Sequence, residues 1–175
     1  MITDLVQIKR LGEKKREENA RFRVHLKMHD YNEKRFRRIG EQIEDQIDCT
    51  VCANCCRVAS VEVSERDIAR LAKSLRITPA KFISEYTVSN EEDKTRDLRR
   101  TPSGCVFLSG NDCTVYEDRP DICRNFPHVV RGEGRTHTRM WQFIDRACYC
   151  PIVYNALEAF KEESGFSSSR REPKS

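Results

Sequence analysis

The stretch Cys49-Thr-Val-Cys52-Ala-Asn-Cys55-Cys56 holds four of the chain's nine cysteines. Two residues between cysteines is the spacing at which a tight turn directs both sulfurs at one metal ion. Three cysteines at this spacing are also typical of iron–sulfur ligand runs, in which a fourth, remote cysteine precedes a proline, as Cys150 does here. Because neighbouring side chains diverge, we expect Cys55 and Cys56 to serve two centres or to have different roles.

The other five cysteines all lie between this stretch and residue 150: Cys105, Cys113, Cys123, Cys148 and Cys150. Cysteine used this heavily indicates either disulfides in an oxidising compartment or thiolate ligation of a metal in a reducing one. The count is odd and the N-terminus lacks the apolar segment of a secretory signal, which together favour metal and a cytoplasmic location. No run approaches the roughly 20 apolar residues of a membrane span, so we expect no membrane association.

The composition points to a modest apolar core, because hydrophobic residues make up 38% of the chain and charged residues 34%. The formal net charge of +4 counts every thiol as neutral. Four thiolates around one Zn²⁺ sum to about −2, so two such sites would cancel that charge. The positive net charge is therefore weak evidence for a polyanionic partner, and we expect no nucleic-acid partner.

Residues 1–48 are dense in charges of both signs and are predicted to be a charged helical arm. Apolar side chains recur there at helical steps of three and four: Phe36, Ile39, Ile43 and Ile47, with a shorter stripe of Val24, Met28 and Tyr31. We predict one long helix from about Glu13 to Ile47, loosened at Gly40. Its stripe packs on the cysteine domain or docks a protein partner.

Residues 49–163 are predicted to form the cysteine-cluster metal-binding domain, and residues 164–175 a tail that is disordered by composition. Capping signals predict helices over 64–75 and from Thr78–Pro79 to Tyr86, followed by a surface loop over 87–103 with at most a short extended segment. The turn 109–112 predicts a hairpin between 105–108 and 113–116, and 129–131 with 136–143 form a candidate second hairpin. A closing helix carries Ile152, Val153, Ala156, Leu157 and Phe160. The fold class is α+β: a small metal-stabilised domain with short hairpins and flanking helices.

The later cysteines lie where the local backbone suits ligands. Cys105 and Cys113 are expected on paired strands, which can bring their sulfurs close together. Cys123 lies in a turn that Pro120 starts and Pro127 ends. Two arginines near it, Arg119 and Arg124, either hydrogen-bond thiolate sulfur and offset its charge or form ordinary surface ion pairs.

These residues resemble the CxxCxxCC cysteine-cluster family, the YkgJ-like zinc- or iron-chelating domain proteins. The resemblance covers about residues 45–155 and rests on the Cys49–Cys56 run, on Gly104-Cys105-Val-Phe-Leu108 with Cys113-Thr-Val-Tyr116, on Arg119-Pro120-x-x-Cys123-Arg124-x-Phe-Pro127, and on Cys150–Pro151. It implies a cytoplasmic domain that binds zinc or iron through eight cysteines: Cys49, Cys52, Cys55, Cys56, Cys105, Cys113, Cys123 and Cys150. Cys148 is an additional cysteine and the reserve choice for the eighth ligand.

The predicted function is chelation of zinc or iron, as mononuclear ions or a 4Fe–4S cluster, with the metal stabilising the fold. Ligand type does not choose between these metals, because thiolate suits both. The alternative is an iron–sulfur or iron-dependent enzyme or accessory subunit for protein modification or redox chemistry, since a similar motif occurs in the flagellin lysine-N-methylases. A third hypothesis is a module that binds an acidic partner through basic side chains of the arm and tail: Arg35, Arg37, Arg38, Arg170 and Arg171.

The sequence identifies no catalytic residue, since no nucleophile–base order, paired-carboxylate motif or phosphate loop stands out. His128 follows Pro127 and is either a ligand or proton donor near the cluster or a polar residue with a structural role. The aromatic side chains of the domain are expected in the core around the metal-bound loops: Phe107, Tyr116, Phe126 and Trp141.

Overall fold

The computed structural model describes residues 1–90, 94–132 and 134–167. The chain forms two compact units, one of Met1–Ile47 with the described residues from Pro127 onward, the other of Asp48–Phe126. We call them unit 1 and unit 2. Helices are combined with three two-stranded antiparallel sheets, which agrees with the predicted α+β class. Residues 168–175, the greater part of the predicted disordered tail, lie outside the described residues and include Arg170 and Arg171.

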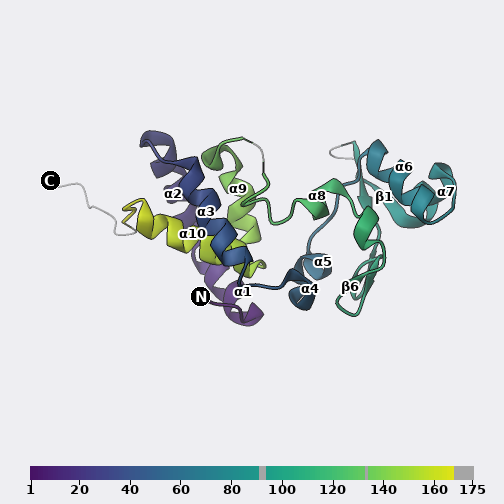
Figure 1. Ribbon diagram of the computed structural model, residues 1–175, viewed down its shortest axis with the longest axis horizontal. Helices are drawn as coiled ribbons and strands as arrows, with labels where there is room; N and C mark the ends of the chain where they lie inside the picture. Colours follow the sequence, from purple (N-terminus) through teal and green to yellow (C-terminus); the bar gives the residue numbers. More distant parts are fainter. Residues whose placement is uncertain (91–93, 133, 168–175) are drawn as a thin grey trace. The chain divides into compact units, whose positions relative to one another are not determined.

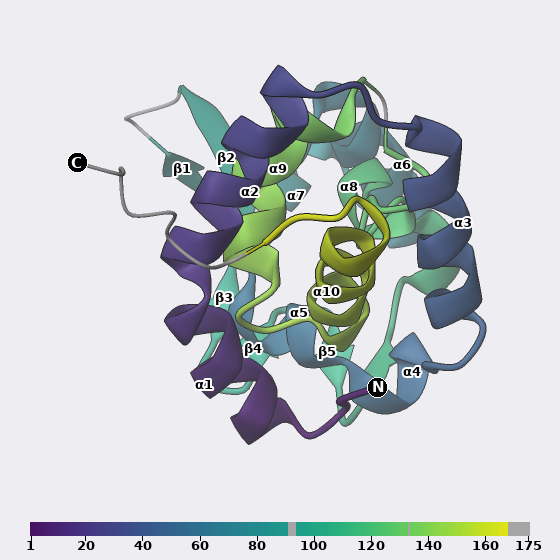
Figure 2. The same ribbon diagram turned by 90° about the vertical axis from the view of Figure 1, so that its left-hand side faces the viewer.

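Unit 1 is helical. Its elements are α1 (Leu5–Lys14), α2 (Arg16–Met28), α3 (Glu33–Glu44), α9 (Thr136–Arg146) and α10 (Pro151–Glu163). The predicted closing helix is confirmed as α10, which is surrounded by the other helices of the unit (Figure 2). The ring centroid of its buried Phe160 lies 4.8 Å from that of Phe36 and 5.7 Å from that of Phe22. Aromatic packing therefore joins α2, α3 and α10.

The single long helix predicted over 13–47 is wrong, because the segment forms three helices. The C-cap residue of α2 is His29, whose backbone is extended, and the N-cap residue of α3 is Asn32, whose side chain accepts from the Lys34 N–H. Asparagine is a favoured N-cap because its side-chain oxygen satisfies a free backbone N–H. This turn points the predicted Phe36/Ile39/Ile43 face of α3 into the unit, and all three side chains are buried.

Two further predictions for unit 1 are corrected. Val24 and Met28 are 59% and 74% exposed, because α2 buries Phe22 and Leu26 instead. The candidate strand over 136–143 is helix α9, with Met140 and Phe143 on its buried side. The Glu33 carboxylate accepts from the Thr136 N–H at 2.6 Å and so caps this helix from another segment. Glu133, in the predicted hairpin turn, lies outside the described residues.

Unit 2 carries the remaining elements. They are α4 (Cys49–Cys52), α5 (Asn54–Val58), α6 (Glu65–Ser74), α7 (Pro79–Tyr86), β1 (Thr87–Asn90), β2 (Thr95–Leu98), β3 (Arg100–Thr101), β4 (Gly104–Cys105), β5 (Leu108–Ser109), β6 (Asp112–Cys113), η1 (Tyr116–Asp118) and α8 (Asp121–Arg124). The capping predictions are confirmed: Ser64 and Asp67 form a capping box on α6, and Thr78 caps α7 with proline at its first position. Helix α7 contacts both α6 and strand β1, and Figure 1 shows the three elements together.

The surface loop predicted over 87–103 is wrong for most of its length. Strands β1 and β2 pair in register from Thr87↔Leu98 to Asn90↔Thr95. The segment before α6 adds to this hairpin, because the Leu98 N–H donates to the Val61 carbonyl at 2.8 Å and the Val63 N–H to the Arg96 carbonyl at 2.9 Å. These long-range bonds stabilise strands whose own sequence is polar.

The core of unit 2 lies between α6, α7 and the small sheets. It contains Ile68, Leu71, Phe82, Leu98, Phe107 and Val115, and Cys105, Cys113 and Cys123 pack against it. Phe107 is buried as predicted, whereas Tyr116 is 46% exposed and, in unit 1, Trp141 is 53% exposed. Those two aromatic side chains are therefore not core residues.

Candidate metal centre

The first cysteine run is divided between two one-turn helices. Asp48 caps α4 by accepting from the Thr50 N–H at 2.8 Å, and α4 then carries Cys49 and Cys52. Ala53 follows in the left-handed conformation, with φ 43° and ψ 17°, and α5 carries Cys55 and Cys56. The change of direction at Ala53 separates the run into two pairs.

The adjacent sulfurs of this run lie close together. Cys55 Sγ and Cys56 Sγ are 4.0 Å apart, so the expected divergence of these neighbours is wrong. Two thiolates on one tetrahedral zinc ion, each with a Zn–S bond of ~2.3 Å, are separated by about 3.8 Å. The pair is thus spaced nearly as two ligands of a single ion would be.

Strand β4 approaches the first run through Gly104. This residue has φ +131°, and a Cβ atom there would lie 2.7 Å from the Cys56 carbonyl oxygen and 2.9 Å from Arg57 Cα. Only glycine permits both this dihedral and this contact. The backbone that carries Cys105 is therefore in direct contact with the backbone that carries Cys56.

The predicted hairpin is confirmed, with a shifted pairing. Leu108 pairs with Cys113 across the β5–β6 turn, whereas Cys105 pairs with Arg100 on β3. Cys105 and Cys113 are therefore on different small sheets and not on directly paired strands. The backbone N–H of Thr114 donates to the Phe107 carbonyl at 2.9 Å, which continues the pairing beside Cys113.

Three side chains that the sequence reasoning missed join the cysteine-bearing segments. Arg57 donates to the Cys52 carbonyl at 3.0 Å, to the Gly110 carbonyl at 3.0 Å and to the Asn111 side chain. Asn111 donates in turn to the Val51 carbonyl at 2.8 Å. Arg100 donates to the Ala59 carbonyl at 2.5 Å and to the Arg57 carbonyl. The one sequence signal for this set is that Arg57 directly follows Cys55-Cys56.

The thiols of unit 2 influence one another electrostatically. The Cys55 thiol hydrogen-bonds Cys56 and lowers its pKa to about 7, against an opposing effect of burial and with help from the Arg57 charge. Burial, together with the charges of Cys56, Cys105 and Cys113, raises the pKa of Cys123 to about 12. The pKa values of Cys105 and Cys113 are also raised, chiefly by burial. A metal that binds here would displace protons from these half-buried thiols.

The two arginines of the Cys123 turn donate to backbone carbonyls. Arg119 donates to the Tyr116 carbonyl at 2.6 Å and lies over the Tyr116 ring at 3.8 Å, and Arg124 donates to the Glu117 carbonyl at 2.9 Å. The charge of Arg119 lowers the pKa of both Cys113 and Cys123, although burial outweighs it. Arg119 thus offsets thiolate charge while its hydrogen bond shapes the turn.

The cysteine pattern of this chain is shared with known proteins. The sequence profile of the CxxCxxCC family, described as "Putative zinc- or iron-chelating domain", matches residues 48–151 and so includes all nine cysteines. The chain belongs to the CxxCxxCC family. A protein of Methanocaldococcus jannaschii named "Uncharacterized protein MJ0661" is 29% identical over 85 residues, which are 47% of this chain and 45% of that protein. The chain therefore spans about half the length of that relative. No solved structure matches.

The last two cysteines of the CxxCxxCC match belong to unit 1. Cys150 is the buried N-cap residue of α10, and the buried Cys148 thiol lies 3.5 Å from the Ile144 carbonyl. His128 has φ +67°, and its carbonyl accepts from Arg139 at 2.7 Å. The assignment of Cys150 as eighth ligand, with Cys148 in reserve, stays a prediction.

The donor set fits the metals of the CxxCxxCC family description. The candidate ligands in unit 2 are all cysteine thiols. Thiolate binds zinc and iron in both tetrahedral and cluster sites. Within the ranges 1–90, 94–132 and 134–167, no three Cys, His, Asp or Glu side chains converge at metal-binding distance. Hydrogen bonds of Arg57 and Arg100 and the close approach at Gly104 connect the cysteine-bearing segments. Among the same residues, no helix has both the length and the apolar character needed to cross a bilayer.

Proposed function

We propose that the chain binds zinc or iron through the cysteines of unit 2, and that the metal holds three separate segments of this unit together. The observation that carries the proposal is that Cys105, Cys113 and Cys123 pack against one core, while the β4 backbone at Gly104 lies against the Cys56 backbone. The charge of Cys56 accordingly raises the pKa of Cys105, Cys113 and Cys123. Thiols far apart in sequence interact in this way only when the fold brings them close.

The metal is proposed to stabilise the fold as well. Unit 2 has a small apolar core, and of the six strands in its described residues four have two residues each. A structural zinc ion contributes about 10–16 kcal/mol to folding in zinc-finger peptides. Removing the metal from unit 2 should therefore loosen α4, α5 and the β5–β6 turn first, because they are connected by a few arginine and asparagine hydrogen bonds.

Metal analysis and a visible spectrum of protein purified without oxygen test the proposal. Zinc sites leave the protein colourless, whereas an iron–sulfur cluster gives a visible absorption band that bleaches on reduction. Cys105→Ser and Cys123→Ser should each lower the metal content, and Cys148→Ser should leave it unchanged. A lower metal content in Cys150→Ser would identify Cys150 as the eighth ligand. Wild-type protein that contains neither metal, and takes up neither after reduction and reconstitution, contradicts the proposal.

A redox role for the same centre is the alternative. A thiol with a pKa of about 7, as for Cys56, is about half thiolate at neutral pH, and a lowered thiol pKa is typical of reactive cysteines. An iron-dependent enzyme or accessory subunit would use such a site with one coordination position open. Binding of an exogenous ligand to the iron, seen as a change in the visible spectrum, would favour this alternative over a closed structural site.

A protein partner at the N-terminal helices stays a separate hypothesis. Arg37 and Arg38 are exposed on α3, and Arg35 pairs with Glu163 at 2.7 Å. An acidic partner bound there would dissociate steeply as salt concentration rises, because exposed charges are screened beyond about 8–10 Å at physiological ionic strength.

A further inference from the structure

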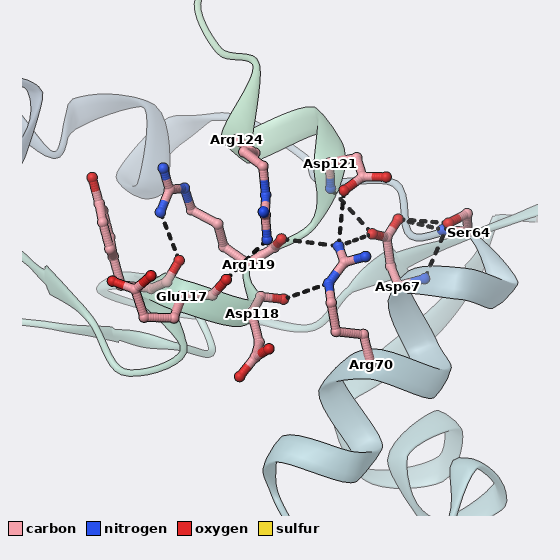
Figure 3. Close-up of polar contacts among 9 residues, drawn as sticks. Ser64, Asp67, Arg70, Glu117, Asp118, Arg119, Asp121 and Arg124 are labelled. Atoms are coloured by element: carbon pink, nitrogen blue, oxygen red, sulfur yellow. Dashed lines mark hydrogen bonds and ion pairs between the residues drawn. The ribbon is translucent and has the colours of Figure 1, made fainter.

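A buried carboxylate on α6 connects this helix to the turn that carries Cys123. Asp67 is 3% exposed, and one of its oxygens accepts from the Ser64 N–H at 3.0 Å and the Ser64 hydroxyl at 2.7 Å. Its other oxygen accepts from the Asp121 N–H at 3.1 Å and from Arg70 at 2.5 Å (Figure 3). The first oxygen completes the capping box, and the second points to a different segment.

Arg70, one turn further along α6, makes the larger part of this connection. Its guanidinium donates to the Asp118 carbonyl at 3.3 Å, the Arg119 carbonyl at 3.1 Å and the Asp121 carboxylate at 3.0 Å, as Figure 3 shows. All three acceptors lie within five residues of Cys123. Ser74 adds a hydrogen bond to the Asp118 carboxylate at 2.7 Å.

The same helix faces the core against which the thiols lie. Ile68 and Leu71 of α6 are fully buried in the cluster against which Cys105, Cys113 and Cys123 pack. One helix thus contacts the core beneath the thiols with its apolar face and binds the Cys123 turn with its polar face. A capping box alone would need neither Arg70 nor the bond from the Asp121 N–H.

We infer that Asp67 and Arg70 are positioning residues that hold the Cys123 turn beside Cys105 and Cys113 before metal binds. The inference deepens the proposed function and rests on it. Residues that orient metal ligands without touching the metal change its affinity by roughly 10–100-fold when removed. The effect of Arg70 should pass through Cys123, since its three acceptors belong to that turn.

The test measures the affinity of the reduced full-length chain for Zn²⁺ by competition with a chromophoric chelator, and the visible spectrum of the Co²⁺-substituted protein. Arg70→Met should weaken Zn²⁺ binding roughly 10–100-fold and change the Co²⁺ spectrum. Arg66→Met, the same exchange at an exposed position of α6, should do neither. Asp67→Asn is the second variant, because an amide oxygen still caps α6 but the amide nitrogen cannot accept from the Asp121 N–H.

A double-variant cycle separates positioning from general stability. In a Cys123→Ser background, Arg70→Met should cause no further loss of affinity. Equal affinity of Arg70→Met and Arg66→Met, or the same loss with and without Cys123, overturns the inference while the proposed function stands. A wild-type chain that binds neither Zn²⁺ nor Co²⁺ overturns the proposed function, and the inference with it, before any variant is compared.

Discussion

Replacing Gly104 with alanine tests whether close approach of β4 and α5 holds the candidate metal centre together. The added Cβ would lie 2.7 Å from the Cys56 carbonyl oxygen and 2.9 Å from Arg57 Cα, both of which are backbone atoms. Rigid backbone cannot yield as a flexible side chain does, so β4 must move away from α5. Overpacking of this kind costs about 1–3 kcal/mol, and a non-glycine residue in a sparsely populated dihedral region costs a further ~1–3 kcal/mol.

The matched control for this substitution is Gly110→Ala. Gly110 also has a positive φ, +62°, but a Cβ atom there would meet nothing within 4 Å. The Gly110→Ala substitution therefore costs only the free energy of placing alanine in the left-handed conformation, about 1–2 kcal/mol. We expect Gly104→Ala to lower the free energy of unfolding by about 1–4 kcal/mol more than Gly110→Ala, because it alone adds the clash.

Urea unfolding of the two variants, followed by far-UV circular dichroism with and without added Zn²⁺, provides the measurement. Gly104→Ala should also weaken Zn²⁺ binding, since the shift separates Cys105 from Cys56, whereas Gly110→Ala should not. Equal unfolding midpoints and equal Zn²⁺ affinity for the two variants would refute the reasoning from this contact.

Three further predictions concern the rest of the chain. Phe160→Ala should lower the free energy of unfolding by about 3–5 kcal/mol, because this buried ring joins α2, α3 and α10, whereas Trp141→Ala at an exposed site should change thermal stability by about 0.5 kcal/mol or less. Burial acts to raise the pKa of Asp67, but the hydrogen bonds from Ser64 and Asp121 and the charge of Arg70 lower it overall. Its stabilisation is therefore present above the unfolded-state pKa and lost as pH falls through the lower folded value, so Asp67→Asn should flatten acid unfolding curves in that range. Arg57→Met should speed amide exchange in the β5–β6 turn, measured by mass spectrometry, because it removes the donors to Cys52, Gly110 and Asn111; unchanged exchange would contradict the role given to Arg57.

The features that the sequence alone determined depend on residues a few positions apart. The capping box of α6, the Thr78–Pro79 start of α7, the β5–β6 turn and the buried stripe of α10 are all short-range patterns, and the structure has each of them. The cysteine spacing also identified the family and the kind of ligand, because thiol chemistry does not depend on the surrounding fold.

Tertiary structure alone decided which segments come together. The β1–β2 hairpin depends on pairing with residues 61–63, and α9 is capped by Glu33, which lies 103 residues before Thr136. Arg70 reaches carbonyls 48 and 49 residues away, and Arg57 reaches a turn 53 residues away. Hydrogen bonds of this range depend on how the chain packs, and a charged side chain on a helix has the same local sequence pattern whether it faces water or binds another segment. For that reason the cysteines could be identified from the sequence, but the residues that hold them in place could not.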